Sequence, residues 1–132
     1  MATIKSYSDL QQSKKLAKIL PIESADMHYN NASIKGVNYV DEYRAELMAY
    51  NDAIKLLSKY NMINPLCEVI PCWSLTALLE ILPYPSLLRT SFGWRCDTSK
   101  KDGYTIKMGD YADNPIDTCY EMIIKLHEQK LL

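Results

Sequence analysis

The sequence predicts an α+β fold in which three main helices and one short helix pack on a two- or three-stranded antiparallel sheet, with a hairpin in the C-terminal half. Apolar residues recur at helical spacing in several segments that prolines end. Between residues 88 and 108, apolar and polar residues alternate as they do in half-buried strands. The length of 132 residues and the hydrophobic share of 48% suit one domain, residues 1–132, with a core of its own.

The first 60 residues are expected to form two helices and a short strand. Ser8 or Ser6 is expected to cap a first helix, which Pro21 ends. Residues 22–29 alternate like a strand, with odd- and even-numbered side chains on opposite faces. A second helix is expected over residues 41–60, because apolar side chains recur there at intervals of three and four residues. These side chains are Tyr43, Leu47, Tyr50, Ile54 and Leu57.

Two further helices are expected in the C-terminal half. Ser74 is expected to cap a short helix over residues 75–82, and Pro83 follows it directly. The last helix carries the clearest start signal, because Asn114 suits the cap position and Pro115 suits the first helical position. Its expected buried face consists of Ile116, Cys119, Tyr120, Ile123, Leu126 and His127.

The alternating segment between these helices predicts a hairpin of two strands. Even-numbered residues of 88–97 and of 104–108, which are apolar except for Thr90, are expected to face inward. For two apolar faces to meet, the numbers of paired residues must add to an even value, which requires an odd-length loop centred on Lys101. The expected pairs are Trp94 with Met108 and Cys96 with Ile106.

Charge and cysteine content restrict the classes of protein that the chain can represent. Fifteen Lys and Arg against sixteen Asp and Glu leave a net charge of −1, without the basic excess typical of nucleic-acid-binding domains. No apolar stretch has the length of a membrane span, and the N-terminus lacks the pattern of a secretory signal. The four cysteines lie at irregular spacings and are expected to be reduced thiols. We therefore expect a cytoplasmic protein without membrane contact.

One candidate for catalysis is a thiol at the start of a helix. Cys72 precedes the cap residue of the short helix, where exposed N–H groups stabilise a thiolate, and His127 or His28 is a candidate base. The alternative is a buried cysteine that packs like a small hydrophobe, which is the more common situation. No metal site or cofactor is expected, because the two histidines belong to no ligand-spaced pair and the four glycines are scattered.

A second candidate is a binding surface on the outer face of the hairpin. Arg89, Arg95 and Lys107 are expected to point outward there, with Tyr104 close by. Cations beside tyrosine bind a nucleic-acid backbone or an acidic protein surface. The alternative is that these cations only protect an exposed strand edge.

Four segments of the chain resemble a family of short uncharacterised proteins from gut anaerobes and their phages or mobile elements. The segments are IPCWSL at 70–75, ALLEILP at 77–83, LPIESADM at 20–27 and the closing helix at 120–126. The resemblance implies an intracellular accessory role and supplies no catalytic residues. Together with the residues above, it favours a non-catalytic accessory or protein-interaction protein of phage or mobile-element type, which binds a protein partner or self-associates. A small thiol-dependent enzyme and a weak nucleic-acid binder are the alternatives.

Overall fold

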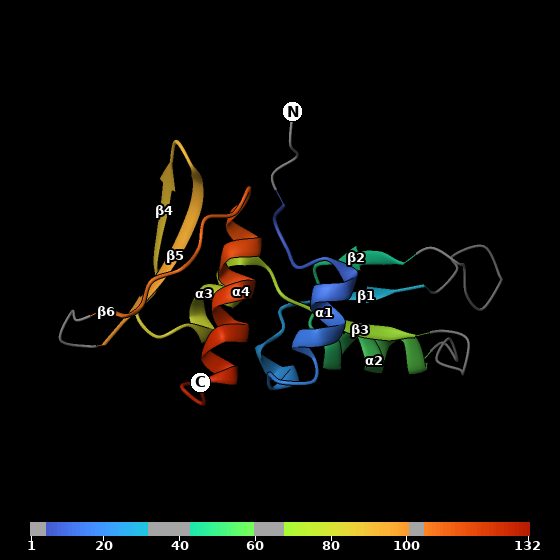
Figure 1. Cartoon of the computed structure of the whole chain (residues 1–132). Helices are drawn as coiled ribbons and strands as arrows, with labels where there is room; N and C mark the ends of the chain where they lie inside the picture. Colours follow the sequence, from blue (N-terminus) through green and yellow to red (C-terminus); the bar gives the residue numbers. More distant parts are fainter. Residues whose placement is uncertain (1–4, 32–42, 60–67, 101–104) are drawn as a thin grey trace. The chain divides into compact units, whose positions relative to one another are not determined.

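Four α-helices and two three-stranded antiparallel sheets make up the computed structural model, which describes residues 5–31, 43–59, 68–100 and 105–132 (Figure 1). This confirms the predicted α+β class, although the strands form two sheets where one was expected. The chain divides into two compact units, Asp9–Trp73 and Met1–Ser8 with Ser74–Leu132. Within the described residues, no helix has the length and apolar character needed to cross a bilayer.

The unit Asp9–Trp73 surrounds its sheet with short helices. Its elements are α1 (Leu10–Leu16), the 3-10 helix η1 (Ile22–Ser24), β1 (Met27–Asn30), β2 (Arg44–Glu46), α2 (Tyr50–Lys59) and β3 (Val69–Cys72). The order of the strands in the sheet is β2-β1-β3. All four residues of β1 are buried, as expected for a central strand covered on both faces.

Helix α1 begins one residue later than the sequence predicted. Asp9, and neither Ser8 nor Ser6, is the cap: its carboxylate accepts a hydrogen bond from the backbone N–H of Gln12 (2.8 Å). The side chain of Gln12 in turn accepts from the backbone N–H of Asp9 (3.0 Å). This reciprocal pair satisfies two N–H groups at the helix start, which a cap at Ser8 would leave to other partners.

The strand predicted over residues 22–29 is wrong at its start, where Ile22–Ser24 form η1, but its alternation is confirmed within β1 by the register of the sheet. Met27 pairs with Cys72 and Tyr29 pairs with Ile70, so these four side chains share one face and form a core cluster. Leu10 of α1, with Tyr43 and Ala45, packs against this cluster.

The predicted helix over residues 41–60 is wrong in its first half. Residues 44–46 form β2, which pairs with β1, and the helix begins only at Tyr50. Leu47, expected on the buried stripe, is 88% exposed between the two elements. Pairing with β1 gives the backbone N–H and C=O groups of this segment hydrogen-bond partners. The stability gained from this long-range pairing outweighs the local preference for a helix. Within α2, the buried residue is Ala53.

The second unit combines three strands with two helices. Its elements are α3 (Leu75–Ile81), β4 (Ser86–Thr90), β5 (Gly93–Ser99), β6 (Thr105–Lys107) and α4 (Pro115–Glu128). The strand order is β4-β5-β6, and α4 contacts both β5 and α3. Ser74 caps α3, and Asn114 caps α4 with Pro115 at its first turn, as predicted.

Two side chains predicted for the buried face of α4 are not buried, and Thr118 and Met122 are buried in addition to the predicted set. Tyr120 is half-buried, and His127 is exposed in the last turn of the helix. The buried side chains are Ile116, Thr118, Cys119, Met122, Ile123 and Leu126, with Pro115 at the helix start.

The hairpin itself is placed differently from the prediction. Residues 88–97 do not form one strand: a turn at Ser91 and Phe92 divides them into β4 and β5, which pair from Thr90 with Gly93 onward. Gly93 has φ +117°, a conformation that residues with a side chain avoid. The alternation of apolar and polar residues continues through this turn, and for that reason the pattern alone conceals it.

The predicted pairs Trp94–Met108 and Cys96–Ile106 are therefore wrong. Strand β6 pairs with Thr98 and Ser99 across an irregularity in the register, and the loop centred on Lys101 lies outside the described residues. Trp94 forms a bridge with Ala112 instead. Three apolar residues expected to face inward are exposed, namely Leu88, Phe92 and Met108.

Candidate interaction surface

One face of the β4–β5 hairpin carries four side chains that meet in the folded chain. Leu88 on β4 is paired with Arg95 on β5, so both point to the same face. The bridge between Trp94 and Ala112 (N···O 2.7 and 2.8 Å) extends the sheet by one more segment and brings Tyr111 beside Arg95. At the tip of the hairpin, the rings of Phe92 and Tyr111 lie 5.8 Å apart at 52°. We call this set the hairpin patch: Leu88, Phe92, Arg95 and Tyr111.

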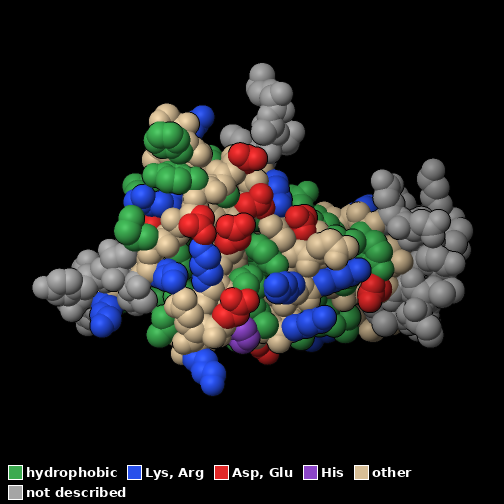
Figure 2. All heavy atoms as spheres, in the orientation of Figure 1, with side chains coloured by type: hydrophobic (Ala, Val, Ile, Leu, Met, Phe, Trp, Pro, Cys, Tyr) green, Lys and Arg blue, Asp and Glu red, His purple; other side chains and the backbone are tan. Residues whose placement is uncertain are grey.

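Three members of the hairpin patch are open to solvent although they are apolar or aromatic. Phe92 is 78% exposed, Tyr111 46% and Leu88 39%. Figure 2 shows hydrophobic side chains gathered at the upper left, over β4 and β5, with Lys and Arg side chains among them. Adjacent large apolar groups that stay exposed are typical of sites where another molecule binds.

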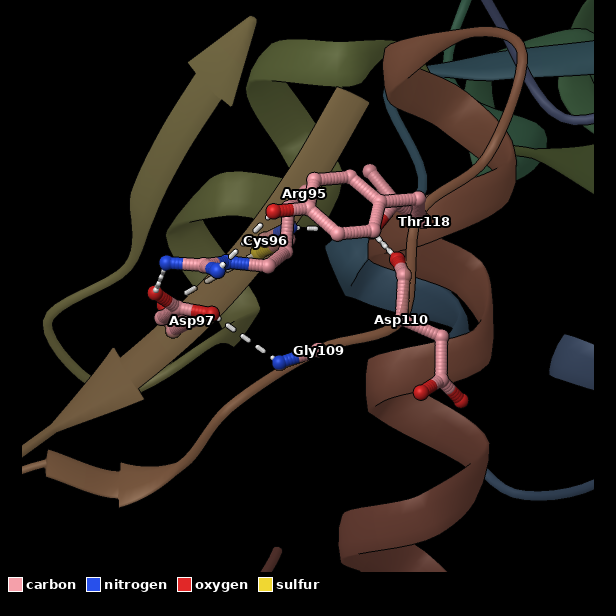
Figure 3. Close-up of polar contacts among 7 residues, drawn as sticks. Arg95, Cys96, Asp97, Gly109, Asp110 and Thr118 are labelled. Carbon is pink, nitrogen blue, oxygen red and sulfur yellow. Dashed lines mark hydrogen bonds and ion pairs between the residues drawn. The ribbon is translucent and has the colours of Figure 1, made fainter. Parts of the chain in front are cut away.

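Arg95 is held in place from two sides. Its guanidinium lies over the Tyr111 ring, 5.6 Å from the ring centre, and its Nη1 donates a 3.4 Å hydrogen bond to the Tyr111 hydroxyl. Its Nη2 forms a 3.0 Å ion pair with Asp97 Oδ2. Asp97 uses its other oxygen to accept a hydrogen bond from the backbone N–H of Gly109 (2.9 Å), and Figure 3 shows these groups side by side. The hydrogen bond that Arg95 donates to Asp97 raises the pKa of Arg95 above its usual range.

Contacts on the inner side of β5 anchor the segment that carries Tyr111. The hydroxyl of Thr118 accepts a hydrogen bond from the backbone N–H of Cys96 (2.9 Å) and donates one to the carbonyl of Asp110 (3.0 Å) (Figure 3). The carboxylate of Asp110 pairs with Lys125, which lowers the pKa of Asp110. The patch therefore rests on a fixed support of strand and helix.

The structure separates the cations that the sequence placed together. Arg89 pairs with Trp94, so it points to the face opposite Arg95, and its guanidinium lies 5.7 Å from the centre of the Trp94 ring. The turn at Ser91 and Phe92 causes this separation, because it places Arg89 and Arg95 on two different strands. Lys107 is the last residue of β6, and Tyr104 lies outside the described residues.

Sequence reasoning missed Leu88 and Phe92 as members of a surface, and it did not place Tyr111 beside Arg95. It assigned Leu88 and Phe92 to a buried face because it extended one strand across the turn. The available signal was Ser91-Phe92-Gly93, in which a glycine follows two residues that do not continue the pairing. No local signal places Tyr111, because its position depends on the pairing of a distant segment.

Cys72 and His28 lie on neighbouring strands but on opposite faces of their sheet. Cys72 is fully buried in the core cluster, where its register partner Met27 shares its face. His28 follows Met27 in β1 and therefore points the other way. The structure does not bring this thiol and this imidazole together. His127, the other candidate base, belongs to the second unit and is exposed.

Both ring nitrogens of the buried His28 have structural partners. Its Nδ1 lies 2.6 Å from the carbonyl oxygen of Met48, which only accepts hydrogen bonds, so Nδ1 carries the proton. Its Nε2 then accepts from the side-chain amide of Asn30 (2.9 Å). Asn30 is oriented by Arg44, whose Nη2 donates to its carbonyl oxygen (3.0 Å). This pattern is that of a neutral histidine that joins the strands to the segment before α2.

The cysteines and acidic residues within the described ranges form no metal site, because no three ligand side chains gather in one place. Cys72, Cys96 and Cys119 are buried and not disulfide-bonded. The hydrogen bond that Cys119 shares with Cys96, together with burial, raises the pKa of Cys119. A thiol in this state is a poor nucleophile.

Comparison with protein-family models, with curated proteins and with solved structures finds no match to this chain. The resemblance to short proteins of gut anaerobes and their phages stays a prediction.

Proposed function

We propose that the chain is a protein-interaction protein that binds its partner through the hairpin patch. The observation that carries the proposal is the exposed Phe92 ring, packed on Tyr111, whose ring and hydroxyl both contact Arg95. Tyr and Arg are enriched among the residues that dominate protein interfaces, and aromatic rings such as Phe92 are enriched within them. The sequence-based expectation of a non-catalytic, cytoplasmic accessory role of phage or mobile-element type belongs to the same proposal.

The patch is ordered before a partner arrives. Arg95 already has its contacts with Asp97 and Tyr111, and Phe92 already packs on Tyr111. Binding therefore immobilises fewer side chains than a loose surface would require, which leaves more of the interaction energy as affinity. Full burial of the Phe92 ring alone is worth about 2 kcal/mol.

Charge favours a protein over a nucleic acid as the partner. A nucleic-acid backbone attracts cations that are available to phosphate, and Arg95 is already paired with Asp97. Arg89 points to the other face, so the two arginines do not form one cationic stripe. The whole chain carries a net charge of −1.

Photo-crosslinking in the producing cell tests this proposal. A benzophenone amino acid replaces Phe92 in the full-length chain, and a matched variant carries it at Leu47, which is also strongly exposed. We expect a protein adduct from position 92 and none from position 47. Absence of any adduct at position 92, or equal adducts at both positions, would overturn the proposal. A nucleic-acid adduct would replace it with the alternative of a nucleic-acid binder.

A further inference from the structure

Strand β4 has an open edge. It is the outermost strand of the order β4-β5-β6, and among the described residues no strand pairs with its outer side (Figure 1). Four of its five residues are exposed, and Arg89 is its sole charged residue. By contrast, the edge strand β2 has two charged residues, Arg44 and Glu46, among its three. Charges protect edge strands from pairing, and β4 has little of that protection.

The geometry of the turn determines which backbone groups point outward. Two residues separate Thr90 from Gly93, so this pair exchanges both of its hydrogen bonds. Hydrogen-bonded and non-hydrogen-bonded pairs alternate along an antiparallel ladder. After Thr90, the next residue of β4 whose backbone is hydrogen-bonded to β5 is therefore Leu88. The N–H and C=O groups of Leu87 and Arg89 therefore point to the open edge.

These two residues are placed symmetrically about Leu88. If the β4 strands of two copies meet antiparallel with Leu88 opposite itself, Leu87 of each copy pairs with Arg89 of the other. That register forms about four backbone hydrogen bonds and pairs all five residues of β4. Leu88 meets its counterpart at a position without ladder hydrogen bonds, where facing side chains approach most closely.

Neighbouring registers are worse for reasons of charge and backbone chemistry. Centring the pair on Arg89 places two guanidinium groups directly opposite each other. Centring it on Leu87 brings Pro85 opposite Arg89, and proline has no N–H to donate. The register centred on Leu88 avoids both defects and buries an apolar side chain that is 39% exposed in the single chain.

We infer that the partner of the hairpin patch is a second copy of this chain, which contacts the patch at Leu88 and is joined to the first copy through β4, so that two sheets become one of six strands. This inference rests on the proposed function and names its partner. The two copies of the hairpin patch then lie on one face of the joined sheet, because Leu88 belongs to both the edge and the patch.

A charge-swap experiment tests the pairing. Sedimentation equilibrium of the full-length chain is expected to show a concentration-dependent dimer. Leu88→Lys and Leu88→Glu each place like charges at the symmetry axis, and each is expected to raise the dimer Kd at least about tenfold. An equimolar mixture of the two variants is expected to recover a dimer that contains one copy of each. Ser86→Lys is the matched control: it lies on the same strand and face, faces Thr90 of the other copy, and is expected to leave the dimer intact.

Amide hydrogen exchange provides a readout that does not depend on the mass of the complex. In the dimer, the N–H groups of Leu87 and Arg89 are expected to exchange slowly, and in Leu88→Lys they are expected to exchange rapidly. The N–H of Leu88 is expected to stay protected in both, because its partner is on β5. Protection of Leu88 in the variant also shows that the hairpin still folds.

The outcomes separate this inference from the proposal on which it rests. A wild-type chain that stays monomeric at concentrations of several hundred micromolar, or a mixture of the two variants that does not associate, overturns the second-copy inference. If position 92 nevertheless crosslinks to a different protein, the proposed function stands with another partner. If no adduct forms either, both fail.

Discussion

Thr118 on α4 accepts a hydrogen bond from the backbone N–H of Cys96 on β5, and the same hydroxyl donates to the carbonyl of Asp110. One buried side chain thus joins a helix, a strand and the segment that leads to Tyr111. The hairpin patch depends on this junction, because the two partners of Arg95, Asp97 and Tyr111, lie on the strand and the segment that it joins.

Thr118→Val is expected to lower the free energy of unfolding by about 1–3 kcal/mol, because it leaves the buried N–H of Cys96 without its partner. Urea denaturation of the variant measures this loss. Thr98→Val is the matched control, since the buried Thr98 hydroxyl has no hydrogen-bond partner among the described residues. Its replacement is expected to be neutral or stabilising. Equal losses in the two variants would contradict this account of the junction.

Gly109→Ala is expected to destabilise the second unit by about 2 kcal/mol or more. A Cβ at this position would lie 2.1 Å from the carbonyl oxygen of Cys96, a backbone atom that a rotamer change does not move. Thermal melting measures the change, and the exposed Met108→Ala serves as a control with little expected effect. A melting temperature for Gly109→Ala equal to that of wild type would show that the segment packs less closely against β5.

The ion pair of Asp110 with Lys125 predicts a defined dependence of stability on pH. The pKa of Asp110 is lower in the folded chain than in the unfolded chain. The contribution of Asp110 to the free energy of unfolding is therefore fully present above the pKa of an unfolded aspartate, about 3.9. It is lost as the pH falls through the pKa of Asp110 in the folded chain. The free energy of unfolding of Asp110→Asn is expected to be lower than that of wild type at pH 7 and to approach it near pH 2.

The control for this prediction is the same substitution in a Lys125→Gln background, where the pH-dependent difference is expected to shrink. The effect is small and is reduced by salt, because both side chains contact solvent. A difference between wild type and Asp110→Asn that stays constant from pH 7 to pH 2 would refute the role of the pair.

His28→Phe is expected to destabilise the first unit by about 1–3 kcal/mol, although phenylalanine is apolar and of similar size. The substitution leaves the carbonyl of Met48 and the amide of Asn30 without their partner in a buried region. His127→Phe, at an exposed position, is the control and is expected to change stability little. If the two variants melt alike, the network around His28 contributes no net stability.

Local signals predicted the elements whose stability is local. Asn114 and Pro115 identified the start of α4, and Ser74 identified the start of α3, because a cap satisfies N–H groups within one turn of itself. The alternation along residues 27–29 identified β1 for a similar reason: adjacent side chains of a strand must face opposite ways.

The errors lie where distant pairing competes with a local pattern. Residues 43–47 fit a helix by the spacing of their apolar side chains, yet Arg44–Glu46 form a strand that pairs with β1. The alternation around Phe92 fits one long strand, yet the chain turns back there and places Arg89 and Arg95 on opposite faces. This second error also made the predicted binding surface wrong, because the face on which a side chain lies depends on the strand to which the residue belongs.

The sequence by itself determined the α+β class, the caps of the last two helices and the apolar and polar alternation of the strands, since these follow from contacts within a few residues. Only the tertiary structure decided that Phe92 and Tyr111 meet on an open face, that Arg95 lies between Asp97 and Tyr111, and that Cys72 and His28 point apart. These relationships depend on strand register, and a register is selected by the energy of pairing segments that lie far apart along the chain.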